Sequence, residues 1–159
     1  MARGTLAAHA EDLFALFQSN DRVHEYNDNC ADVRDLEVVS QHSKITWARS
    51  PRFGPFKARD FVTVVSYTTL ADGTLAVVNR PVNHAAAPAT KDYVRAEILI
   101  ATNMMRANAH DPRKTDFVTV AHVNPGGVAD STLGANVVNM LCAQAPLKLL
   151  QALERAANS

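Results

Sequence analysis

The longest apolar pattern of the chain lies near its end, where apolar residues recur every four positions from Leu133 to Leu153. This spacing predicts a helix over residues 131–157 with one continuous apolar stripe. The Asn-Pro-Gly-Gly sequence at 124–127 precedes it and predicts a turn, because proline fixes φ and glycine admits positive φ. Pro146 falls inside the helical pattern, so we expect a kink or a break there.

The earlier part of the chain predicts short helices followed by strands. Helical spacing over Thr5–Ser19 and again over Arg22–Tyr26 predicts two short N-terminal helices. The period then changes to two, without helical connections, which favours an antiparallel meander in an α+β fold. One segment, Asp60–Thr69, is apolar on both faces and predicts a sheet that is covered on both sides. The expected strands are Leu36–Gln41, Ser43–Ala48, Asp60–Thr69, Thr74–Val82, Tyr93–Met104 and Asp116–Val123.

Composition and charge narrow the class of protein. Sixteen basic and sixteen acidic residues cancel, so no global charge favours nucleic acid as a partner. Cys30 and Cys142 lie far apart, which is typical of free thiols in a reducing compartment. No apolar run approaches the roughly 18 residues of a membrane span. We therefore expect a single cytoplasmic domain over residues 1–159.

Patterns typical of catalytic or metal sites are missing from the sequence. The histidines never reach a His-x-x-x-His spacing, and Gly126-Gly127 lacks the lysine of a phosphate loop. The charged residues most restricted in position are those of Arg59-Asp60 and Arg95-Ala96-Glu97, because these segments lie in or beside apolar strands. Each arginine there either pairs with a carboxylate or contacts a ligand headgroup. We expect no catalytic residue, no metal and no cofactor, and a cavity rather than an active site.

Several segments follow the order and spacing of one known family. Arg22–Asn27 is similar to the Arg-x-x-Trp-Asp segment of that family, with Tyr26 in place of tryptophan. The other matching segments are Arg59-Asp60-Phe61-Val62, Asn79-Arg80-Pro81-Val82-Asn83-His84, Tyr93-Val94-Arg95-Ala96 and Val123-Asn124-Pro125-Gly126-Gly127. Together they resemble the START domain, the family of steroidogenic-acute-regulatory-related lipid-transfer proteins. The resemblance implies a helix-grip fold, in which a curved antiparallel sheet wraps around a long C-terminal helix and encloses one lipid.

The chain departs from the family at its beginning. Family domains begin with a helix and three strands, and Met1–Gly4 resembles only the tail of the third strand. Four residues cannot cover the whole edge of the strand 116–123, whose inner face would carry Phe117, Thr119 and Ala121. We therefore expect that the natural chain extends upstream of Met1, or that it forms a homodimer through this edge.

The resemblance leaves the ligand open. Polar side chains hold the headgroup in the ceramide-carrying branch of the family, and an acid–base pair lies in the cavity of the cholesterol-carrying branch. Only Asn79 keeps both its type and its hydrogen-bonding capacity among the ceramide positions, which argues against ceramide, and the acid–base pair of the cholesterol branch is absent. The resemblance therefore implies a tunnel that is less polar than in either branch, and it leaves the choice among a sterol, a phospholipid and a sphingolipid open. The positions are Asn27, Ala48, Asn79 and Thr119 for ceramide, and Thr46 and Val65 for cholesterol.

Strand alternation predicts the side chains that line the cavity. If Asn79 points inward, every second residue of its strand does so too, and the same rule extends to the neighbouring strands. The alternative is that these residues fill a solid core. The expected lipid-binding residues are Asn27, Thr46, Ala48, Phe61, Thr63, Val65, Val77, Asn79, Leu99, Ala101, Asn103, Thr119, Val137, Leu141 and Leu149.

The segment 49–57 is the other candidate for function. Two prolines and a glycine prevent regular structure there, and aromatic rings stand among cations, which suits a membrane surface. The family places a loop at the mouth of its tunnel at this point. The expected membrane-contact residues are therefore Arg52, Phe53, Phe56 and Lys57, although the two rings could instead pack on the C-terminal helix.

These observations predict a non-enzymatic domain that binds or transfers one lipid or another apolar ligand. The C-terminal helix and the 49–57 loop would gate its hydrophobic tunnel. One alternative is a helix-grip enzyme of the cyclase or hydrolase kind, with Arg95 and Glu97 as its acid–base pair. The other alternative is a regulatory interaction module whose tunnel has collapsed.

Overall fold

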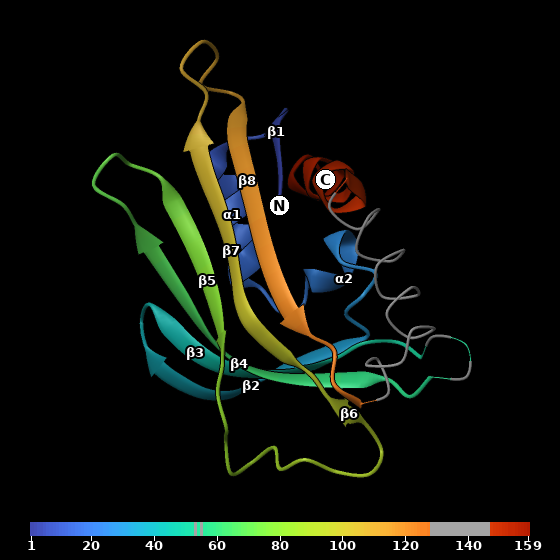
Figure 1. Ribbon diagram of the computed structural model, residues 1–159. Coiled ribbons are helices and arrows are strands. Elements are labelled where there is room, and N and C mark those ends of the chain that lie inside the picture. The colour runs from blue at the N-terminus through green and yellow to red at the C-terminus, as the bar shows by residue number, and fades with distance from the viewer. Residues whose placement is uncertain (53, 55, 128–146) are drawn as a thin grey trace.

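The computed structural model describes residues 1–52, 54, 56–127 and 147–159. Figure 1 shows a bent antiparallel sheet with the C-terminal helix on its concave side, which confirms the helix-grip class. The elements are β1 (Ala2–Leu6), α1 (Ala10–Gln18), α2 (Val23–Tyr26), β2 (Asp32–Ser40), β3 (Ser43–Arg49), β4 (Arg59–Thr69), β5 (Leu75–Pro81), β6 (Val94–Arg95), β7 (Glu97–Ala107), β8 (Thr115–Asn124) and a final helix over residues 147–157.

The sheet has eight strands rather than about six. Its order is β1-β8-β7-β5-β4-β3-β2, and the short β6 pairs in parallel with the start of β4. The single strand expected over Tyr93–Met104 is therefore divided. Val94 and Arg95 lie beside Arg59 and Asp60, and the chain then crosses to pair with β5 and β8 as β7. The chain thus passes from the start of β4 to β7, and β5 lies between these two strands in the sheet.

The first strand extends two residues into the segment where a helix was expected. The helical pattern was expected from Thr5, but α1 begins at Ala10, because Thr5 and Leu6 belong to β1. β1 pairs with β8 from Ala2 opposite Thr119 to Leu6 opposite Thr115. The prediction of an open edge was thus wrong for this half of β8. Association through the remaining 120–124 edge stays a prediction, which sedimentation at micromolar concentration tests.

The main core lies on the concave face of the sheet. Alternate residues of β4, β5, β7 and β8 point into it, and the periodic apolar positions of α1 and of the final helix meet them. Among the most deeply buried side chains are Met105 and Leu153 at 0% exposed and Phe117 at 1% exposed. The cluster consists of Leu6, Ala8, Ala10, Leu13, Leu16, Tyr26, Val65, Tyr67, Val77, Met105, Phe117, Leu150, Leu153 and Ala156.

A second, smaller core covers the opposite face. Trp47, Val62 and Ala87 are buried there, and Val82 and Tyr93 from the two ends of the β5–β6 loop pack against them. Figure 1 shows this long loop passing beneath β4. The expectation that Asp60–Thr69 is covered on both sides is therefore confirmed.

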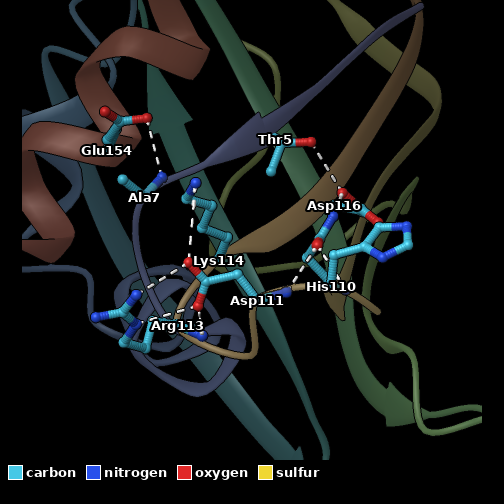
Figure 2. A network of polar contacts seen from close by, with 9 residues as sticks. Thr5, Ala7, His110, Asp111, Arg113, Lys114, Asp116 and Glu154 are labelled. Atoms are coloured by element: carbon cyan, nitrogen blue, oxygen red, sulfur yellow. Dashed lines mark hydrogen bonds and ion pairs between the residues drawn. The ribbon is translucent and has the colours of Figure 1, made fainter.

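Polar contacts fix the end of the final helix to the first residues of the chain (Figure 2). The backbone N–H of Ala7 donates to Glu154 Oε2 at 3.1 Å, and the amide of Asn158 donates to the carbonyl of Ala7 at 2.8 Å. The Thr5 hydroxyl donates to Asp116 Oδ1 at 2.9 Å and so ties β1 to β8. This end of the fold is closed by packing and by hydrogen bonds together.

Candidate functional site

The concave face beyond the main core carries most of the residues expected to line a cavity. Strand register places Asn79 beside Val65 on one side and beside Ala101 on the other. In the next row, Asn103 stands opposite Val77 and opposite Thr119. Counted along each strand, these residues lie an even number of positions from core residues such as Val77, Met105 and Phe117. Their side chains therefore point to the same face as the core. Strand alternation therefore groups them as the sequence predicted.

A band of neutral polar groups crosses this face diagonally. It begins with Thr46 and Thr63, whose hydroxyls are 3.1 Å apart and hydrogen-bonded to each other. It continues through Asn79 on β5 to Asn103 and Thr119, which are each 9% exposed. On one side of the band lies the sealed core of Val77, Met105 and Phe117. On the other side the face is apolar and less covered.

The less covered end retains exposed apolar surface. Phe61, Ala48 and Ala101 are half-buried, and Val123, which register places on the concave face opposite Ile98, is 40% exposed. A register shift between Ile98 and Ile100 interrupts the alternation of β7 at Leu99, which is 37% exposed. Strict alternation places Leu99 on the concave face with Ala101 and Asn103, but the alternation is interrupted at this position. Ile98 was missed for the same reason, since no sequence signal marks this irregularity.

The other residues that were expected to line the cavity do not belong to this group on the sheet. Asn27 lies in the turn after α2, where its side-chain oxygen accepts a hydrogen bond from the backbone N–H of Asn29 at 3.1 Å. Leu149 is half-buried and packs against the main core. Val137 and Leu141 lie outside the described residues, and so does Pro146 with its expected kink.

The 49–57 loop lies beside the turn at 124–127. The backbone carbonyl of Lys57 accepts a hydrogen bond from Arg59 Nη1 at 2.7 Å, and Arg59 Nε donates to the carbonyl of Pro125 at 3.4 Å. The Arg59 guanidinium also lies 6.0 Å from the ring of Phe56, which is half-buried. Arg52 and Lys57 are exposed, and Phe53 lies outside the described residues.

The turn itself depends on glycine. Gly126 and Gly127 have φ values of 63° and 64°, as the sequence pattern predicted. A Cβ atom on Gly126 would lie 2.5 Å from the carbonyl oxygen of Arg95. The turn at the end of β8 therefore packs directly on β6, which places the loop, the turn and the less covered end of the sheet together.

The constrained charges form a structural pair on the convex face. Arg95 donates to both oxygens of Asp60, at 3.0 and 2.9 Å, and Trp47 Nε1 donates to Asp60 Oδ2 at 3.0 Å. Burial by itself raises the pKa of the Asp60 carboxyl, but the hydrogen bonds from Arg95 and Trp47 outweigh it and hold this pKa below its usual value. The arginine thus pairs with a carboxylate, as one of the two interpretations predicted.

The acid–base pair of the enzyme alternative is not formed. Glu97 is exposed and accepts a hydrogen bond from Asn124 at 3.4 Å, whereas Arg95 is bound to Asp60. In the described part of the chain, no three His, Cys, Asp or Glu side chains are grouped to hold a metal ion. No helix in that part is long and apolar enough to cross a membrane.

A hollow of about 380 Å³ on the convex face is a weaker candidate for a ligand site. Two of its three polar side chains already have partners, since His84 Nε2 lies 3.0 Å from Glu37 and Arg95 holds Asp60. The hollow is lined by Asn83, His84, Ala85, Ala87, Pro88, Ala89 and Arg95. The concave face, with its apolar surface and its polar band, is therefore the stronger candidate.

Comparisons with known proteins agree with this geometry. The family description that matches the chain is the START domain, over residues 4–154. The mitochondrial steroidogenic acute regulatory protein of Danio rerio is 30% identical over 146 residues, which cover 88% of this chain and 48% of that protein. The chain thus spans about half the length of this relative.

Solved structures share the fold at low sequence identity. Human StAR-related lipid transfer protein 5 superposes with a TM-score of 0.86 at 19% identity, over 98% of this chain and 73% of that one. The Zhui aromatase/cyclase from Streptomyces sp. R1128 superposes with a TM-score of 0.59 at 15% identity, over 99% of this chain and 91% of that one. Both likenesses concern the fold alone.

Proposed function

Since this chain belongs to the START domain family, whose members bind and transfer lipids, we propose that it encloses one lipid or another apolar ligand against the concave face of its sheet. The observation that carries the proposal is the contrast between the two ends of this face. One end is sealed by Val77 and Phe117 at 1% exposed, whereas Val123 at the other end is 40% exposed. Burial of a lipid chain at the more exposed end would contribute about 0.8 kcal/mol per methylene.

The same contrast supports a route of entry. Leu150, Leu153 and Ala156 anchor the final helix at the sealed end, where Glu154 also accepts the Ala7 hydrogen bond. A ligand would therefore enter at the opposite end, beside the 49–57 loop, with that loop and the C-terminal helix acting as the gate. A cytoplasmic location, transient contact with a membrane and the absence of catalysis belong to the same proposal.

Native mass spectrometry of the chain purified from cells tests the proposal. We expect an added mass of one lipid per chain, which is lost when the sample is extracted with organic solvent. A protein that carries no lipid, and that takes up none from vesicles, would contradict lipid binding and favour the alternative of an interaction module without a cavity.

The membrane contact leads to a separate prediction. The double variant Phe53→Ala with Phe56→Ala should weaken binding to liposomes, because each aromatic ring that enters the acyl boundary contributes about 1 kcal/mol or more. Cosedimentation with phosphatidylcholine vesicles measures this effect, with Leu70→Ala as the control because Leu70 is 45% exposed in a distant hairpin. Unchanged binding with an unchanged melting temperature would remove the membrane role of the two rings.

A further inference from the structure

The strand β2 ends the sheet on one side, and its outer edge is open (Figure 1). Among the described strands it pairs with β3 alone. It is 9 residues long and contains no proline, glycine or lysine. Exposed edges are normally blunted by such residues or covered by another element, because unpaired backbone N–H and C=O groups attract a further strand. The edge of β2 is therefore available for pairing.

The charged side chains of β2 do not guard this edge. All four are engaged by residues of β3 or of the β5–β6 loop, which lie within the sheet or on its faces rather than beyond β2. An approaching strand would therefore meet no unpaired charge. The four contacts are Asp32 with Arg49 at 3.6 Å, Asp35 with Lys44 at 3.0 Å, Glu37 with His84 at 3.0 Å, and Arg34 over the ring of Trp47 at 4.8 Å from the ring centroid.

The same edge carries exposed apolar side chains. Val38 is 73% exposed and Val39 is 52% exposed, and among the large apolar residues that the structure describes only Met1 is more exposed than Val38. The residues on either side, from 37 to 42, are all exposed as well. One exposed valine is ordinary on a protein surface, but two in sequence on an open edge provide the side-chain contacts that strand pairing buries.

We infer that β2 pairs antiparallel with β2 of a second copy of this chain, about a two-fold axis at Val38. A two-fold contact brings the same surface together from both copies, so that surface must tolerate its own charge. The charges of β2 are already engaged and the formal net charge of the chain is zero, so two identical edges meet without net repulsion. This inference is independent of the proposed function, because edge pairing leaves the concave face of each copy free.

The positions of the carboxylates select the register. In an antiparallel pair about a two-fold axis, residues that are equally far from the axis stand opposite each other. An axis at Glu37 would oppose two carboxylates, and an axis at Leu36 would place Asp35 opposite Glu37. Like charges directly opposite each other are destabilising. An axis at Val38 instead places Val38 opposite its own copy and Glu37 opposite Val39.

Two irregularities limit the length of the pairing. The register of β2 against β3 shifts between Asp35 and Glu37 and again between Val38 and Ser40. Such bulges interrupt a regular ladder, so pairing is confined to a few residues around Val38, and an axis at Val39 would fall inside the second irregularity. The interface is then smaller than the roughly 1,200 Å² of stable complexes, so the dimer is weak and depends on concentration.

Sedimentation velocity from low micromolar to several hundred micromolar concentration tests the inference. The sedimentation coefficient of the purified chain should rise with concentration. Val38→Lys should raise the dissociation constant about fivefold or more, because it opposes two like charges at the axis. Leu70→Lys is the matched control, since Leu70 is 45% exposed in the β4–β5 connection. Both side chains are exposed, so neither variant should change the melting temperature. A monomer at every concentration, or equal losses in both variants, would overturn the inference.

A disulfide test locates the axis. In a chain with Cys30→Ser and Cys142→Ser, Val38→Cys should form a covalent dimer on mild oxidation, because opposite residues of an antiparallel pair lie about 4.5 to 5.5 Å apart between Cα atoms. Leu70→Cys reports the rate of random collision, which Val38→Cys should exceed. Val123→Cys probes the 120–124 edge of β8, where Val123 is 40% exposed. A covalent dimer from Val123→Cys but not from Val38→Cys would overturn the inference in favour of that opposite edge.

Discussion

Replacing Arg95 by methionine should lower the free energy of unfolding by about 3 to 5 kcal/mol, because it leaves a buried carboxylate without its cation. The side chain of Asp60 is 4% exposed and that of Arg95 is 22% exposed, so little solvent screens the pair. The carboxylate would lose both hydrogen bonds from Arg95 and would keep the one from Trp47. Urea denaturation followed by circular dichroism measures the change.

An exposed ion pair provides the matched control. Arg106 lies 3.3 Å from Asp72, and these side chains are 61% and 52% exposed. Arg106→Met should therefore cost less than about 1 kcal/mol. If both arginine variants had the same small effect, the Asp60–Arg95 pair would not be a buried element of the fold.

The pH dependence gives a second test of the same pair. The pKa of Asp60 in the folded chain lies below the ordinary value of 3.8. Its contribution to stability is therefore complete above that value and is lost as the pH falls through the lower folded pKa. Without Arg95, burial would raise the pKa of Asp60. The stability difference between the wild type and Arg95→Met should shrink in acid, and a constant difference would contradict this assignment.

Replacing Phe117 by alanine should cost about 3 to 5 kcal/mol, because it removes a large side chain from the centre of the main core. Phe117 is 1% exposed, and its ring is stacked on that of Phe17 at 6.3 Å between centroids. The contact joins β8 to α1 beneath the polar band. Thermal and urea unfolding both report the loss.

Leu70→Ala serves as the comparison for the core. This leucine is 45% exposed in the β4–β5 connection, so its removal should change stability by no more than about 0.5 kcal/mol. If Phe117→Ala cost as little, the sealed end of the concave face would not be packed, and the contrast that supports the lipid site would be lost.

Local patterns predicted those parts of the site that depend on neighbouring residues. Alternation along β5 and β8 placed Asn79 and Thr119 on the face of Val77 and Phe117, since successive strand residues point to opposite faces. The same rule failed at Leu99, because an irregularity between β7 and β8 shifts the register there. Such a shift depends on how two strands pair, which periodicity within one strand does not record.

Long-range pairing explains the other differences from expectation. Thr5 and Leu6 fit a helical pattern, yet they form β1, because the edge of β8 offers backbone partners 110 or so residues away. Asp60 and Arg95 were recognised as constrained charges in apolar strands. Their mutual pairing became evident only where β6 lies beside β4.

The sequence by itself determined the α+β class, most strands, the turn at Gly126 and Gly127, and the resemblance that identifies the family. Each of these follows from residue type and spacing within a short segment. The tertiary structure alone decided which strands pair and which neighbours the polar band has on the concave face. These properties depend on residues far apart in the chain, such as Asn103, Thr119 and Lys44, whose relative positions are set by the register of the whole sheet.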